Sequence, residues 1–307
     1  MIQNLPIYPH LEEICRKLKE SPSHFLILTA ETAAGKSTAV PVALLKHFSG
    51  KIIMLEPRRL AVFAIAERVS EILGEKPGGT CGYRVQLDSC VSGQTRFEVI
   101  TEAILTKKLQ SDPSLEGVSV VVIDEFHERS VHSDLALAFL KDAMQIRDDL
   151  YVLVMSATIE TKQLSEYLGI HREGLIPNED VKRTPAELEL SEGLIPAEVF
   201  HVPGRKFPVS IEYAGNISPA KAILNELEKI RELEENSKLG KNQAENKKNT
   251  ILAFFPGISD IRRCKAELEE RNAFAEILVL HSSIPFSEQK KVLVPPDKSI
   301  LAEKSIS

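Results

Sequence analysis

The segment TAETAAGKSTAVP (residues 29–41) contains residues that could bind phosphate groups. It follows an apolar run and leads into a helical pattern, which is the context of the phosphate-binding loop G-x-x-x-x-G-K-[ST]. Gly35, Lys36 and Ser37 are in register with that motif, whereas Ala30 stands at its first glycine position. An ordinary strand-to-helix turn could also contain G-K-S, so this segment alone leaves both interpretations open.

Each part of this loop has a chemical role if the segment binds a nucleotide. Backbone N–H groups from Ala33 to Ser37 would face the phosphates, because a helix N-terminus favours anions. The Lys36 ammonium would reach the β- and γ-phosphates, and the Ser37 hydroxyl would ligate Mg²⁺. The residues that we expect to bind the nucleotide are Thr32, Ala33, Ala34, Gly35, Lys36, Ser37 and Thr38.

Alanine at position 33 replaces the glycine that is common in such loops. A left-handed backbone conformation costs an L-residue about 1–2 kcal/mol. We therefore expect Ala33 either to be mildly strained or to give the loop a different shape. Binding should persist in both cases, since alanine has the same backbone N–H donor as glycine.

The segment GVSVVVIDEFHERS places two carboxylates, Asp124 and Glu125, at the end of an apolar strand pattern. Asp124 could hold Mg²⁺ through its water shell, and Glu125 could orient or deprotonate the attacking water. Acidic pairs at strand ends are also common as solvated turns. Together with the loop at residues 29–41, however, this pair favours a nucleoside triphosphatase.

Two further segments carry polar residues just after predicted strands. In MSAT, the hydroxyls of Ser156 and Thr158 could bond to the acidic segment and sense the γ-phosphate, although such residues can also be ordinary N-caps. In MLEPRRLA, Arg58 and Arg59 begin a helix and aim two guanidinium groups at an anion. The alternative for this pair is a solvated basic first turn.

Composition limits the classes of protein to consider. The 307 residues carry a net charge of −6 and include no apolar run long enough to span a membrane, and the N-terminus lacks a secretory signal. We expect a cytoplasmic protein whose four separated cysteines are reduced. Because the net charge is negative, any nucleic-acid contact must come from a local basic patch. No stable protein partner can be predicted.

Short apolar runs alternate with amphipathic helical patterns over the first half of the chain, which predicts an α/β fold with a mainly parallel sheet. In such sheets, ligands bind at the carboxyl ends of the strands. The predicted strands are HFLILTA, KIIMLEP, RFEVIT, GVSVVVIDE and LYVLVMSAT.

The pattern suggests about two domains. We assign residues 1–170 to a first domain, 171–199 to an insertion or linker, and 200–307 to part of a second domain of the same kind. TILAFFPG and AEILVLHSS are predicted strands of the second domain.

Taken together, AETAAGKST, LEPRRLA, GYRVQ, TEAIL, DEFHERS and MSAT resemble, in this order, the motifs of superfamily 2 DEAH/RHA-type helicases, and most closely the bacterial HrpB subgroup. The resemblance implies two RecA-like domains, ATP with Mg²⁺ between them, and a strand of RNA or DNA across both. It also implies that Glu125 is the catalytic base and that His127, with Asp124 and Glu125, completes the DExH motif. By the same resemblance, coupling residues are Ser156, Ala157 and Thr158, and strand-binding residues are Arg58, Arg59, Thr101 and Glu102.

Two departures from the family pattern affect the functional hypotheses. Phe126 replaces the alanine of DEAH, and the chain contains neither a T-N-I-A-E-T nor a Q-R-x-G-R-x-G-R type segment, as if it stopped within the second RecA-like domain. Arginines of the latter kind are worth about 10³–10⁵ in rate, so we expect impaired hydrolysis. The hypotheses are an ATP-dependent helicase, a non-catalytic remnant that binds nucleotide or nucleic acid, and a P-loop ATPase unrelated to nucleic acids.

Overall fold

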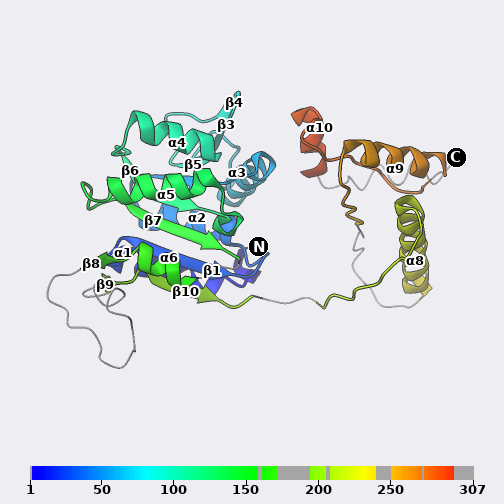
Figure 1. Ribbon diagram of the computed structural model, residues 1–307, viewed down its shortest axis with the longest axis horizontal. Coiled ribbons are helices and arrows are strands. Elements are labelled where there is room, and N and C mark those ends of the chain that lie inside the picture. The colour runs from blue at the N-terminus through cyan, green and yellow to red at the C-terminus, as the bar shows by residue number, and fades with distance from the viewer. Residues whose placement is uncertain are drawn as a thin grey trace. The chain divides into compact units, whose positions relative to one another are not determined.

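Apolar segments rich in β-branched residues form one eight-stranded sheet (Figure 1). The computed structural model describes residues 2–157, 161–171, 194–204, 208–239, 250–271 and 273–293. It divides into two compact units, Met1–Phe207 and Pro208–Ser307, and the sheet belongs to the first. The five strands predicted for this unit are confirmed as β1 (Phe25–Ala30), β2 (Lys51–Leu55), β5 (Phe97–Ile100), β6 (Val118–Ile123) and β7 (Tyr151–Ser156).

The strand order in the sheet is β10-β1-β7-β6-β2-β5-β3-β4, and every pairing is parallel except that of β3 with β4. The mainly parallel α/β fold is therefore confirmed. The strands that the sequence did not predict as such are β3 (Cys81–Val85), β4 (Asp88–Cys90) and β10 (Glu198–Val202). An ion-pair network helps to hold β3, because the buried Glu98 carboxylate binds Arg84 Nε at 2.5 Å and Lys51 Nζ at 3.2 Å.

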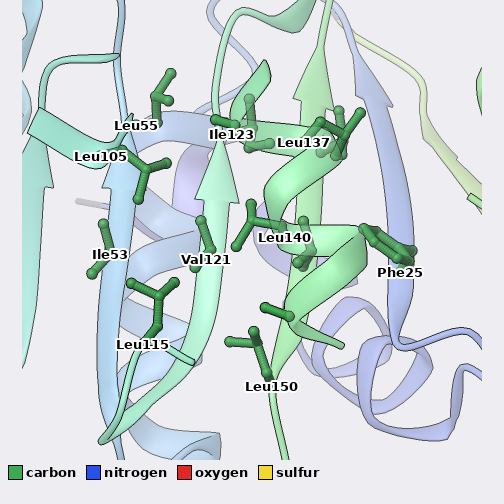
Figure 2. Packing of buried hydrophobic residues seen from close by; sticks show 14 of the residues in the cluster. Phe25, Ile53, Leu55, Leu105, Leu115, Val121, Ile123, Leu137, Leu140 and Leu150 are labelled. Atoms are coloured by element: carbon green, nitrogen blue, oxygen red, sulfur yellow. The ribbon is translucent and has the colours of Figure 1, made fainter. Parts of the chain in front are cut away.

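Helices cover the sheet, and all but the last of them lie where the sequence pattern predicts a helix. They are α1 (Leu11–Glu20), α2 (Lys36–His47), α3 (Arg59–Leu73), α4 (Glu102–Ser111), α5 (Val131–Ala143) and α6 (Thr161–Tyr167), with short 3₁₀ turns η1 (Ile2–Asn4), η2 (Tyr8–His10) and η3 (Phe126–Glu128). Helices α4 and α5 pack on one face, where Leu137 and Leu140 of α5 belong to the same buried cluster as Val121 and Phe25 (Figure 2). Within the described residues, no helix is long and apolar enough to cross a membrane.

The predicted linker at residues 171–199 lies largely outside the described residues. Its described ends form a two-stranded sheet of β8 (Ile170–His171) with β9 (Leu194–Ile195). Strand β10 then pairs with β1 in the large sheet, so the first unit extends to Phe207. The predicted boundary between the linker and the second domain was a few residues earlier.

The second unit contains α8 (Pro219–Leu239), α9 (Ile258–Glu270), α10 (Phe286–Lys290) and the turn η4 (Lys291–Leu293). Its small core includes Ala220, Cys264 and Leu268. The strands predicted at TILAFFPG and AEILVLHSS are wrong for the described structure, which has no strand in this unit. An apolar run becomes a strand only when a neighbouring segment satisfies its backbone groups, and here Leu252 and Phe254 are instead 73% and 87% exposed.

The packing of α5 on the sheet predicts which leucine matters for stability. Leu140 is fully buried, whereas Leu87 in the β3–β4 connection is 97% exposed. Leu140→Ala should lower the free energy of unfolding by about 2–5 kcal/mol, because it leaves a cavity. The matched change Leu87→Ala should alter it by less than about 0.5 kcal/mol. Urea unfolding of both variants checks this, and equal effects would contradict the packing described.

Candidate nucleotide and nucleic-acid site

The predicted functional segments meet at one edge of the sheet. Strands β1, β7, β6, β2 and β5 are consecutive neighbours and parallel, so the loops after their carboxyl ends lie on the same side. These loops carry the G-K-S segment, MSAT, DEFHERS, PRR and TEAIL, respectively. The sheet thus brings together segments that are far apart in the sequence.

The phosphate-binding loop is a tight turn from β1 into α2. Gly35 is the N-cap of α2, with φ of 95° in the left-handed region. Ala33 is also left-handed, with φ of 62°, so it adopts the strained conformation considered from the sequence. The turn is closed by the Ala39 N–H, which donates to Gly35 O at 2.9 Å, and by the Ala34 N–H, which donates to Glu31 O at 3.3 Å. Of the residues predicted to bind the nucleotide, Thr32 and Ala33 are exposed, whereas Ala34 and Lys36 are buried.

A segment before α1 supports this loop from behind. The Ile7 N–H donates to Ala34 O at 3.2 Å, and Ile7 is fully buried. A Cβ added at Gly35 would lie 2.7 Å from Leu5 Cδ1. Glycine at position 35 is therefore required both by its φ and by the approach of Leu5.

The Lys36 side chain is folded back onto the loop that precedes it. Its Nζ donates to Ala30 O at 2.5 Å and to Glu31 O at 3.1 Å. Burial lowers the pKa of Lys36, while the nearby carboxylates of Asp124 and Glu125 oppose this shift. The ammonium group is thus held near the acidic pair by carbonyl groups, which a phosphate oxygen could replace.

Asp124 is completely buried, and burial raises its pKa to about 6 although the Ser37 side chain lowers it. Its Oδ1 accepts from the Glu125 N–H at 2.9 Å. Its Oδ2 is buried and has no hydrogen-bond partner of normal geometry among the described residues. A buried carboxylate oxygen without a partner, beside a hydroxyl, suits Mg²⁺, which prefers hard oxygen ligands. Asp124 and Ser37 therefore fit the predicted metal site.

His127 lies between the second acid and the end of β7. Its Nδ1 is 3.3 Å from Glu125 Oε2 and 3.3 Å from Ser156 Oγ. The acidic segment and MSAT are therefore in direct polar contact through one imidazole. Ala157 is partly exposed, and Thr158 lies outside the described residues.

The turn η3 that follows Asp124 has an unusual backbone. Glu125 and Arg129, which flank it, both have φ of 49°. Non-glycine residues in this region are uncommon and cluster at functional sites. Phe126, which replaces the alanine of the DEAH motif, is 2% exposed and belongs to the main core, so it anchors the turn.

Arg58 is held at both its backbone and its side chain. Its N–H donates to Glu56 Oε1 at 3.0 Å, and its Nη2 lies 2.6 Å from Glu128 Oε1. Burial, followed by the proximity of Asp124, raises the pKa of Glu56 to about 8. Arg59 is exposed at the first position of α3.

Glu102, at the start of α4, is directed toward α5. Its Oε1 accepts from Ser133 Oγ at 2.7 Å and also from Ser130 Oγ. Ser130 is the N-cap of α5, and its Oγ accepts from the Ser133 N–H at 3.0 Å. Thr101 is the N-cap residue of α4 and its carbonyl accepts from the Ile104 N–H. Glu102 thus fixes the helix that follows the acidic segment.

Fold and site together define a protein of the P-loop α/β class. The family model described as "DEAD/DEAH box helicase" matches residues 9–167, and the chain therefore belongs to that family. This confirms the resemblance drawn from the ordered motifs.

Individual relatives agree with this assignment. The chain is 37% identical over 298 residues to "ATP-dependent RNA helicase HrpB" of Escherichia coli (strain K12), which covers 96% of the chain and 32% of that protein. It is 31% identical over 327 residues to "RNA editing associated helicase 2" of Trypanosoma brucei brucei (strain 927/4 GUTat10.1), covering 95% of the chain and 14% of that protein. The chain thus spans about a third or less of the length of these relatives.

A solved structure shows the same fold. The crystal structure of the Escherichia coli DEAH/RHA helicase HrpB matches with a TM-score of 0.68 and 35% identity, covering 96% of the chain and 33% of that structure's chain. The RecA-like class predicted from the motifs is confirmed.

Several residues of the site were not singled out from the sequence. Glu56 and Glu128 lie inside the quoted segments LEPRRLA and DEFHERS, but nothing in their spacing shows that both hold Arg58. Leu5 and Ile7 precede α1. The apolar residues of this N-terminal segment, MIQNLPIYPH, were a signal that it packs on the rest of the unit.

The raised pKa of Glu56 predicts a pH dependence of stability. Because the folded-state pKa of about 8 exceeds the ordinary value of 4.5, the folded protein holds a proton that the unfolded chain has lost. Stability should therefore fall as pH rises through this window. Between pH 6 and 8, above the pKa of Asp124, the free energy of unfolding of wild type should fall by about 2 kcal/mol because of Glu56. Glu56→Gln should not show this fall.

Urea unfolding at these pH values, without nucleotide or Mg²⁺, measures this effect. Glu71→Gln on the exposed part of α3 is the control, since it removes the same charge where it is solvated. Identical pH slopes for wild type and Glu56→Gln would show that Glu56 is not buried as described.

Proposed function

We propose that this chain binds ATP with Mg²⁺ and couples the nucleotide to a single strand of nucleic acid, as part of an ATP-dependent helicase. The observation that carries the proposal is the buried Asp124, with its unpartnered oxygen, at the same sheet edge as Lys36 and Ser37. Solvated acidic turns do not bury a carboxylate in this way. A cytoplasmic location remains a prediction from the sequence.

In the proposed mechanism, backbone N–H groups of the loop and Lys36 bind the phosphates. Mg²⁺ held by Ser37 and Asp124 would neutralise charge that develops on the phosphate oxygens. Glu125 acts as the base that orients or deprotonates water, and His127 links it to Ser156 at 3.3 Å. This contact supports the role proposed for MSAT, because a movement of the acidic segment would shift MSAT through His127.

Arg58, Arg59, Thr101 and Glu102 are proposed to lie along the bound strand. Arg58 and Arg59 are exposed at the start of α3, where a guanidinium group can bind phosphate in a bidentate manner. For Glu102, the structure supports an indirect role, since its Oε1 already accepts from two serine hydroxyls. The relatives' names specify RNA, which favours RNA over DNA as the strand.

A second candidate function is binding without efficient turnover. The 307 residues contain no Q-R-x-G-R-x-G-R segment to supply arginines to the γ-phosphate. Single-turnover hydrolysis of ATP, measured with and without oligoribonucleotide, distinguishes the two candidates. Strand-stimulated hydrolysis supports the helicase activity, whereas nucleotide binding without hydrolysis supports the binding function.

Lys36 should be essential for nucleotide affinity. Lys36→Ala should weaken binding of a fluorescent ATP analogue by at least about tenfold, because it removes a charge-assisted contact to phosphate. Lys46→Ala, at the exposed opposite end of α2, is the matched control and should leave affinity unchanged. If both variants bind like wild type, the loop does not hold the nucleotide.

Ala33 should matter much less than Lys36. Ala33→Gly relieves a left-handed alanine but keeps the N–H donor, so ATP affinity should stay within about tenfold of wild type. The same fluorescence titration measures this. A larger change in either direction would mean that the Cβ of Ala33 shapes the binding loop.

A further inference from the structure

The ion pair between Arg58 and Glu128 joins a residue proposed to bind the strand to the turn that carries the catalytic pair. The Arg58 side chain is 72% exposed and that of Glu128 is 28% exposed, with 2.6 Å between Nη2 and Oε1. Arg58 is also anchored through its N–H by Glu56. The backbone that carries this guanidinium is therefore held in place, and the partner of the guanidinium is a partly buried carboxylate.

A guanidinium group binds a carboxylate and a phosphate with the same planar, two-pronged geometry. Glu128 thus lies where a strand phosphate would contact Arg58. A phosphate that approaches must displace the Glu128 carboxylate, which has the same sign of charge. The pair therefore weakens strand binding until Arg58 changes partner.

Glu128 is also part of the strained turn. Its N–H donates to Glu125 O at 2.9 Å, and this turn lies between the left-handed Glu125 and Arg129. Phe126 is fixed in the core, so a displacement of Glu128 must be taken up by the short segment between these two residues. The same segment presents His127 to Ser156.

We propose that Glu128 is a positioning residue that occupies the phosphate-binding side of Arg58 and transmits strand binding to the turn containing Glu125. This inference rests on the proposed binding of nucleic acid. It gives Glu128 two measurable effects. It should lower strand affinity, and it should be required for coupling between strand and nucleotide.

The first effect can be tested by fluorescence anisotropy with a labelled oligouridylate and the full 307-residue chain. Glu128→Gln should bind about two- to fivefold more tightly than wild type, the range expected for loss of a partly exposed ion pair. Arg58→Ala should bind more weakly and with a smaller salt dependence. In the Arg58→Ala background, Glu128→Gln should have no further effect.

Glu71→Gln is the matched control, because it breaks the Arg68–Glu71 pair on α3 and removes the same charge. Tighter binding by Glu128→Gln than by Glu71→Gln supports the proposal, and equal binding overturns it. Glu128→Ala gives a second variant, and thermal unfolding confirms that each is folded. If wild type binds no oligouridylate, the proposed function fails together with this inference. If wild type binds but Glu128→Gln and Glu71→Gln bind equally, only this inference fails.

The second effect is measured as a linkage. The affinity for a fluorescent ATP analogue is determined with and without saturating oligouridylate, since coupling between two ligands is reciprocal. Wild type and Glu71→Gln should show the same ratio of affinities, whereas Glu128→Gln should bring the ratio close to one. An unchanged ratio in Glu128→Gln, or no coupling in wild type, would overturn the link.

Discussion

Two carboxyl groups buried together at the edge of the sheet set the requirements for the rest of this site. Asp124 is 0% exposed and Glu56 is 2% exposed. Burial raises the pKa of both carboxyl groups, and the proximity of Asp124 raises the pKa of Glu56 further. Burying like charges is unfavourable unless a cation or hydrogen bonds compensate. Lys36 supplies part of that compensation, because its charge lowers the pKa of Asp124.

In the proposed Mg²⁺ site, this arrangement lowers the stability of the fold and raises the affinity for the metal ion. A site whose acids were fully paired would be more stable but would have nothing to offer a magnesium ion. The surrounding sheet tolerates the unfavourable term because its core is extensive, with Ile123 and Leu55 fully buried on the strands that end at these acids. The same strands fix the two carboxyl groups with little freedom to move apart.

Backbone strain at the site is a second unfavourable term that the surrounding core maintains. Ala33, Glu125 and Arg129 are left-handed, which costs about 1–2 kcal/mol for each residue. Each strained turn has a buried neighbour that holds it, Ile7 beneath the phosphate-binding loop and Phe126 within the turn η3. The strain is therefore held by core packing, so the turns are shaped before any ligand arrives.

The sequence predicted the parallel sheet and the gathering of the motifs because both depend on local patterns. Apolar runs such as VSVVVI make buried strands wherever neighbours exist, and parallel strands must present their carboxyl ends together. The strands predicted in the second unit failed because TILAFFPG has no paired neighbour in the described structure. Strand pairing is a relation between segments and cannot be derived from one of them.

The site shows the same limit at the level of single side chains. Which motifs approach each other was predictable, but the partners of Arg58 and Glu102 were not, because they depend on rotamers and on the length of the turn η3. Both residues were expected to face a nucleic-acid strand, and in the structure both contact residues 128–133. Two segments that follow neighbouring strands, β2 and β5, therefore contact residues 128–133, just after Glu125. Under the proposed function, a ligand that moved either segment would act on residues 128–133, so strand and nucleotide would share this element of the first unit.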